Sequence, residues 1–144
     1  MKRLFVAATL IVITGSLALA QNDDAAVKKD KELLKGVWKL ESFETQQGKK
    51  DDFEGATLEF KLDGNAEFTK AGDAKKATYS INPAGKPKEL DLKPEGKDEA
   101  MLGIYRLEKD VLTICIVEGA GNARPSEFAA KDRNVLVTFK RDKK

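Results

Sequence analysis

The sequence predicts an all-β protein, an antiparallel up-and-down barrel of about eight or nine strands preceded by a short helix. Two observations lead to this prediction. After Gly36, apolar residues alternate with polar ones in short runs, and turn-forming residues separate these runs roughly every 8–12 positions. Lysine is abundant on the polar side of the alternation, as expected for a sheet whose outer face meets solvent.

The helix is predicted over about residues 25–35. Val27 and Leu34 lie two helical turns apart and, together with Leu33, form one narrow apolar stripe. Gly36 follows directly, in the position where glycine commonly ends a helix.

The predicted strands all lie after this glycine. They cover residues 38–43, 58–62, 66–68, 79–81, 90–92, 101–107, 111–117, 128–130 and 135–139. Asp63 and Gly64 mark a hairpin turn, because both central residues of such a turn adopt positive φ. The run 111–117 is apolar on both faces, so we expect the N-terminal helix to cover it from outside.

Residues 1–20 have the pattern of a secretory signal peptide. Lys2 and Arg3 form a basic start, an apolar stretch follows, and small residues end with Ala20, which predicts cleavage before Gln21. The apolar stretch is shorter than the roughly 20 residues that span a bilayer, which argues against an uncleaved membrane anchor. We therefore expect an exported protein, periplasmic or secreted, with no membrane span after cleavage.

Cleavage would leave a flexible segment over residues 21–31 and a single barrel domain over residues 32–144. Without Lys2 and Arg3, the chain has 24 basic and 24 acidic residues, interspersed along the sequence. No basic stripe is present that could follow a phosphate backbone, so nucleic acid is not an expected partner.

The composition removes several kinds of chemistry. The chain has no histidine and one cysteine, which excludes Ser–His–Asp and Cys–His catalysis, an intramolecular disulfide and a zinc site built from thiolates. Asp51, Asp52 and Glu54 lack the spacing of a calcium loop and are interpreted as turn residues. We expect no enzyme, no cofactor and no metal, and a hydrolase that uses carboxylates alone is the remaining catalytic alternative.

Gly36-Val37-Trp38 opens the first strand, and Arg141 follows the last, with Lys140 as the alternative for the same position. This arrangement resembles the Gly-x-Trp signature of lipocalin-like barrels. The resemblance implies that the tryptophan closes the barrel floor and that the arginine lies over its ring, in a cation–π contact worth about 0.5–2 kcal/mol. Gly36, Trp38 and Arg141 would then form a structural signature, and the alternative for Trp38 is a place in the wall of a ligand cavity.

Longer segments resemble a family of small, uncharacterised, secreted lipocalin-like domains typical of planctomycete-type bacteria. The matching segments, in chain order, are 36–38, 87–92, 103–105, 112–115 and 124–128. The resemblance implies a lipocalin-like barrel over nearly the whole mature chain. That family has no established activity, so the resemblance supplies no catalytic residues.

Three residues are candidates for ligand binding. Tyr105 and Arg106 are neighbours on a predicted strand and therefore point to opposite faces. Arg106 inside the barrel would suit a carboxylate or phosphate group, but an unpaired buried charge is costly, so we favour Tyr105 in the core and Arg106 outside. Arg124 follows a glycine-rich loop, where it would bind an anion or, in the interpretation we favour, hold the loop through backbone carbonyls.

Cys115 lies in the most apolar predicted strand. A reactive thiol needs exposure and a nearby cation, and the sequence offers neither, so we expect a buried, inert thiol. A disulfide-linked dimer is the alternative.

These observations lead to two hypotheses about function. The first is an exported barrel that binds a small apolar or amphipathic ligand, because a closed barrel of about eight strands can hold one small molecule. The alternative is a filled barrel that acts as a protein-interaction or inhibitor module in the cell envelope, through the loop at residues 118–124.

Overall fold

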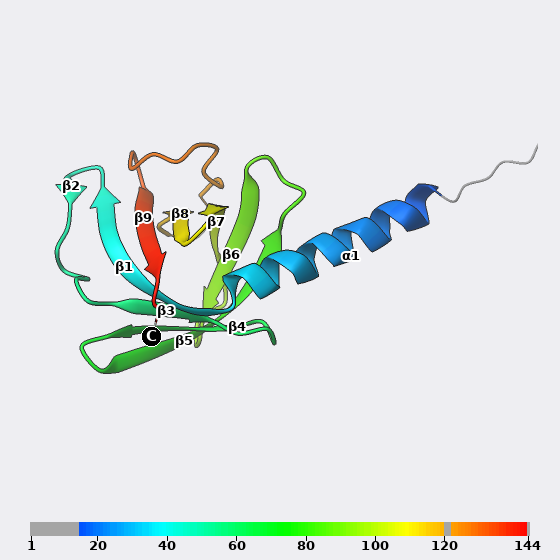
Figure 1. Ribbon diagram of the computed structural model, residues 1–144. Coiled ribbons are helices and arrows are strands. Elements are labelled where there is room, and N and C mark those ends of the chain that lie inside the picture. Colours follow the sequence, from blue (N-terminus) through cyan, green and yellow to red (C-terminus); the bar gives the residue numbers. More distant parts are fainter. Residues whose placement is uncertain (1–14, 120–121, 144) are drawn as a thin grey trace, which may run out of the picture.

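The computed structural model describes residues 15–119 and 122–143 (Figure 1). This part of the chain forms one helix followed by nine strands. The elements are α1 (Gly15–Leu34), β1 (Gly36–Thr45), β2 (Gly48–Lys49), β3 (Thr57–Phe60), β4 (Asn65–Lys70), β5 (Asp73–Asn82), β6 (Lys88–Pro94), β7 (Met101–Glu108), β8 (Val111–Val117) and β9 (Asn134–Arg141).

The strands form a closed antiparallel barrel of eight strands, and the two-residue β2 pairs only with the end of β1. Strand β1 pairs with β3, each strand from β3 to β9 pairs with the next one along the chain, and β9 returns to pair with β1. The closing register places Trp38 opposite Arg141, and a bulge between Leu40 and Ser42 shifts the register further along. The predicted all-β, up-and-down barrel with an N-terminal helix is confirmed.

The ends of the barrel differ. At one end lie the start of β1, the β3–β4, β5–β6 and β7–β8 turns and the end of α1; we call this the closed end. The other end, which we call the open end, carries the β4–β5 turn, residues 95–100 and the long connection between β8 and β9. Helix α1 meets the barrel only by its C-terminal part, and the rest of the helix projects away from it (Figure 1).

Several elements differ from the prediction. Helix α1 begins at Gly15, ten residues earlier than expected, and includes the segment 21–31 that we expected to be flexible. Residues 128–130 form no strand, because the chain there crosses the outside of the barrel instead of pairing within it. The hairpin at Asp63 and Gly64 is present, but only Gly64 has positive φ, since the turn closes over 61–64 with Gly64 as its last residue.

Residues 1–14, most of the predicted signal peptide, lie outside the described residues. In the part of the chain that the structure does describe, no helix is both long enough and apolar enough to span a bilayer.

Trp38 fills the closed end. Its side chain is completely buried, and the indole Nε1–H donates a hydrogen bond to the carbonyl oxygen of Leu34 at 2.9 Å. That carbonyl belongs to the last turn of α1, where backbone oxygens have no partner within the helix. The indole therefore seals the barrel and caps the helix at once.

Arg141 also holds the C-terminal end of α1. Its guanidinium lies 4.2 Å from the centre of the Trp38 ring, and it donates hydrogen bonds to the carbonyl oxygens of Leu33 at 2.6 Å and Lys35 at 3.1 Å. Gly36 permits this approach because its φ of +117° is one that residues with a Cβ rarely adopt. Lys140, the alternative, instead pairs with Glu41 on the surface.

Asp30 makes the second attachment of α1. Its side chain is almost fully buried and accepts hydrogen bonds from the Tyr105 hydroxyl at 2.5 Å and from Lys88 Nζ at 2.9 Å. A buried carboxylate is tolerated when charged and neutral donors satisfy it, as they do here. The cluster thus joins the helix to β6 and β7.

The outer face of β8 is covered by residues 122–133, which we call the outer segment, and not by α1 as predicted. Cys115 Sγ lies 3.6 Å from the carbonyl oxygen of Ala129, and the Arg106 guanidinium lies 4.6 Å from the Phe128 ring centre. The prediction was wrong because Asp30 and Arg141 hold α1 at the closed end, whereas the long β8–β9 connection folds back over its own strand.

Replacing Arg141 by lysine is expected to lower the free energy of unfolding by about 1–2 kcal/mol. A lysine can place its charge over the Trp38 ring, but its single ammonium cannot also bridge two carbonyls. Urea denaturation followed by circular dichroism measures the change. The control is Lys140→Met, which removes an exposed ion pair from the neighbouring residue and is expected to cost less than about 0.5 kcal/mol. Equal losses in the two variants would contradict the role of Arg141.

Candidate ligand-binding cavity

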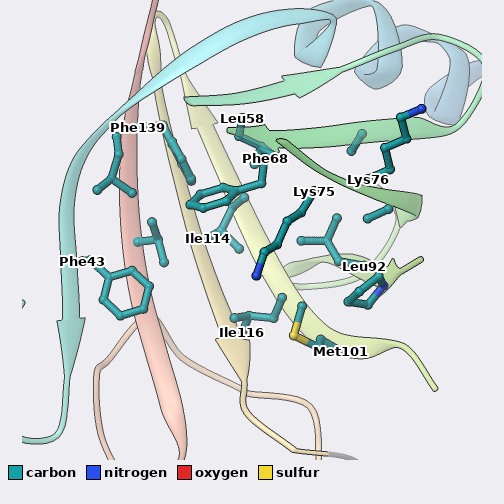
Figure 2. A pocket seen from close by; sticks show the side chains of 15 residues that line it. Phe43, Leu58, Phe68, Lys75, Lys76, Leu92, Met101, Ile114, Ile116 and Phe139 are labelled. Atoms are coloured by element: carbon teal, nitrogen blue, oxygen red, sulfur yellow. The ribbon is translucent and has the colours of Figure 1, made fainter. Parts of the chain in front are cut away.

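A cavity of about 260 Å³ occupies the open end of the barrel (Figure 2). Its lining is apolar except for two lysines, and every barrel strand contributes to it. The lining residues are Leu40, Phe43, Leu58, Ala66, Phe68, Lys75, Lys76, Ala77, Leu92, Pro94, Met101, Ile114, Ile116, Val137 and Phe139.

The space exists because small side chains meet on the inner face. Ala66 on β4 pairs directly with Ala77 on β5, so these two strands contribute only methyl groups to the interior at that level. The side chains across the barrel, from β8 and β9, are of ordinary core size and do not reach far enough to fill the gap. A large side chain at Ala77 would occupy the space.

Between the cavity and the closed end lies a dense aromatic and aliphatic layer, which we call the floor. Phe60 and Tyr79 pack edge to face with ring centres 4.9 Å apart, and Leu90 and Leu112 are buried beside them. Trp38 lies at this closed end and does not line the cavity, so it is a structural plug. The cavity therefore lies between this floor and the open end of the barrel.

Aromatic residues gather at one side of the mouth. Phe53, from the connection between β2 and β3, lies 4.4 Å from Phe43 and 6.1 Å from Phe68 between ring centres. Lys70 lies 4.8 Å from the centre of the Phe53 ring. These contacts fix the shape of the rim from β1 to β4.

Lys75 is the charged residue whose side chain enters the cavity. It pairs in register with Phe68 on β4, and directly paired residues share one face of a sheet, so both point inward. Figure 2 shows its ammonium group among apolar side chains, above Ile116. Lys76 belongs to the outer face, since it pairs with Glu67, and it contributes to the rim.

The three residues predicted to bind a ligand lie elsewhere. Tyr105 points inward at the closed end, where burial and the hydrogen bond to Asp30 raise the pKa of its hydroxyl far above the usual value. Arg106 points outward, over Phe128, and pairs with Glu108 at 3.0 Å. Neither residue lines the cavity, and ligand binding by them stays a prediction.

Arg124 also lies outside the barrel. Its Nη1 donates hydrogen bonds to Asp91 Oδ1 at 2.6 Å and to the carbonyl oxygen of Gly103 at 2.9 Å. These bonds pin the outer segment to β6 and β7, as in the loop-holding interpretation, while anion binding by Arg124 stays a prediction. Arg106 and Arg124 thus lie on one outer wall, apart from Tyr105.

Cys115 is fully buried on the outer face of β8, beneath the outer segment. Burial raises the pKa of its thiol above the usual value. The raised pKa disfavours the thiolate, which is the reactive form of cysteine. The position therefore agrees with an inert, buried thiol.

The strand predicted over residues 79–81 is too short to include Lys75, whereas β5 begins at Asp73. The alternation of side chains along this strand does place Lys75 on the inner face. Extended backward from Tyr79 and Ile81 in steps of two, it puts Ala77 and Lys75 on the same face. The pairing of Ala66 with Ala77, by contrast, needs the register between strands, which no local pattern supplies.

The described residues contain no group of three or more acidic, cysteine or histidine side chains placed to hold a metal ion. Asp63 instead accepts the backbone N–H of Asn65 at 3.0 Å, which lowers the pKa of its carboxyl and marks it as a turn residue. Comparison of the chain with models of protein families, with curated proteins and with solved structures finds no significant match.

Tyr105→Phe tests the closed end through its dependence on pH. In the unfolded chain a tyrosine ionises near pH 10, whereas in the folded protein the raised pKa keeps Tyr105 neutral to higher pH. The stability that the neutral hydroxyl contributes is therefore complete below about pH 10 and is lost as the pH rises further.

We expect the free energy of unfolding of the wild type, relative to Tyr105→Phe, to fall by up to about 1.4 kcal/mol per pH unit above about pH 10. Urea unfolding of both proteins at a series of pH values measures this difference. A difference that stays constant between about pH 9 and pH 11 would show that the hydroxyl ionises alike in the folded and unfolded chains.

Proposed function

We propose that this protein is an exported binding protein that holds a small apolar or amphipathic molecule inside its barrel. The observation that carries the proposal is the apolar cavity, open at one end and closed at the other by the layer above Trp38. Concave apolar sites with few polar groups are typical of small-molecule binding. The floor means that a ligand would enter and leave by the open end.

The size of the cavity limits the ligand. Its volume, about 260 Å³, is just below the range of roughly 300–1,000 Å³ that is common for small-molecule sites. We infer a ligand with a short or narrow apolar part, which gains about 25 cal/mol for each Å² of apolar surface removed from water. The unfilled interior also favours this function over that of a filled barrel acting as an interaction or inhibitor module.

Membership of the family of secreted lipocalin-like domains is part of the proposal. The arrangement of Gly36, Trp38 and Arg141 at the closed end supports it, because the resemblance implied this contact. The signal-peptide pattern of residues 1–20 supports export.

Ala77→Phe tests whether the cavity binds a ligand. N-phenyl-1-naphthylamine, a neutral probe that fluoresces in apolar surroundings, is expected to bind the wild type. The variant places an aromatic ring in the cavity and is expected to bind the probe at least about tenfold more weakly, a loss of 1.4 kcal/mol. A fluorescence titration measures both dissociation constants.

The matched control is Thr78→Phe, which adds the same ring to the next residue, on the outer face of β5. It is expected to bind the probe like the wild type. Absence of probe binding to the wild type, or equal weakening in the two variants, would contradict binding in this cavity.

Export is tested by the mass of the protein recovered outside the cytoplasm. Expressed in a secreting bacterial host, the full chain is expected to yield a product that begins at Gln21, because small residues precede this bond. Ala20→Arg places a large charged side chain at the cleavage site and is expected to retain residues 1–20. An exported wild type that still carries residues 1–20, or a wild type confined to the cytoplasm, would contradict this part of the proposal.

A further inference from the structure

Lys75 gives the cavity a polarity that the apolar lining alone would not have. Its side chain leaves the inner face of β5, and its ammonium group lies within the cavity (Figure 2). Among the described residues, no carboxylate lies within 4.0 Å of its Nζ atom, although nine ion pairs form elsewhere in this part of the chain. The inward-pointing cation therefore has no acidic partner among residues 15–119 and 122–143.

The position of the ammonium explains why the fold tolerates it. Lys75 remains exposed overall, since it lies in the third residue pair from the turn between β4 and β5, near the mouth of the barrel. A lysine can keep its charged end in water while its methylene groups cover apolar surface. The ammonium group is therefore accessible at the mouth.

The neighbouring charges on these two strands add to the same field. Lys70 lies over Phe53 at the rim, and Lys76 contributes to the cavity lining. Asp73, the first residue of β5, pairs in register with Lys70 and not with Lys75. With Glu67 beside Lys76, three lysines still face two carboxylates on these strands, so the β4–β5 side of the mouth is net positive.

We propose that the cavity is a site for single-chain anionic amphiphiles, with the anionic group at Lys75 and the chain in the apolar interior. This inference rests on the proposed function and adds the chemical class of the ligand. A carboxylate at the mouth would accept a charge-assisted hydrogen bond from the ammonium, the stronger kind of hydrogen bond. The chain would run past Ile116 and Phe68 toward the floor, so both parts of the ligand meet matching surface.

The class follows from what the lining lacks. Lys75 and Lys76 bring the only charged side chains that the described lining contains, and both are cations. A neutral alcohol of the same chain length would leave the ammonium unpaired, and an alkylammonium would be repelled by it. The order of affinity is therefore expected to be carboxylate, then alcohol, then ammonium.

Three ligands with the same chain test this order, namely decanoate, decanol and decylammonium. Each is titrated against the full-length mature protein carrying N-phenyl-1-naphthylamine, and displacement of the probe gives its affinity. We expect the wild type to bind decanoate about tenfold more tightly than decanol, and decylammonium most weakly. Raising the salt concentration is expected to reduce the advantage of decanoate, because exposed charges are screened.

Lys75→Met keeps the length of the side chain and removes the charge, so decanoate and decanol are expected to bind it with equal affinity. Lys75→Arg is expected to restore the preference for decanoate. The control is Lys93→Met, which removes a lysine from the outer face of the next strand, where it pairs with Thr78, and should retain the preference. Each variant is compared by its ratio of decanoate to decanol affinity, a quantity that a general loss of stability would not change.

The outcomes separate the two proposals. Equal binding of decanoate and decanol by the wild type, or a preference that survives in Lys75→Met, would overturn the role of Lys75 and leave a binding cavity standing. A probe that binds but is displaced by none of the three compounds would overturn the proposed ligand class alone. A wild type that does not bind the probe would overturn both.

Discussion

Trp38 and Arg141 meet where the first and last strands of the barrel pair, and the rest of the structure depends on this contact. A sheet of eight strands closes into a barrel only if β9 pairs with β1. The register of this pairing places Trp38 opposite Arg141. The same two side chains bind the carbonyls of Leu33, Leu34 and Lys35, so closing the barrel also ends and anchors α1. The guanidinium stacks on the indole ring, and the N–H groups of both side chains supply the hydrogen bonds that carbonyls at a helix end otherwise lack.

With one end sealed in this way, the two ends of the barrel become unlike. The closed end contains the large buried side chains, and it has a second polar attachment in Asp30 with Tyr105 and Lys88. On the wall formed by β4 and β5, Ala66 and Ala77 lie side by side and leave a space that the side chains of the opposite wall do not fill. The fold therefore combines a densely packed floor with an unfilled apolar cavity, and the proposed function uses both.

The outer segment, in the long connection from β8 to β9, packs against the outside of the barrel wall. Two contacts of its described part, from Arg124 to Asp91 and from Ala129 to Cys115, lie on the outer face. This placement explains why the most apolar strand, β8, can be apolar on both sides, because one side meets the barrel interior and the other meets the outer segment. The two arginines that the sequence suggested as ligand-binding residues, Arg106 and Arg124, form ion pairs outside the barrel. Lys75 is the cation whose side chain enters the cavity.

The sequence by itself determined the all-β class, the chain order of most of the strands and the end of the helix at Gly36, because alternation and turn residues are local signals. It indicated the residues of the closing contact, Trp38 and Arg141, through their places at the start of the first strand and the end of the last. It also placed Tyr105 in the core and Arg106 outside by cost of burial alone. Only the tertiary structure decided that Ala66 meets Ala77, that Asp30 reaches Tyr105, and that the outer segment rather than α1 covers β8. These contacts join residues far apart in the chain, and they depend on the register between strands and on the path of a long loop, neither of which alternation along a single strand can specify.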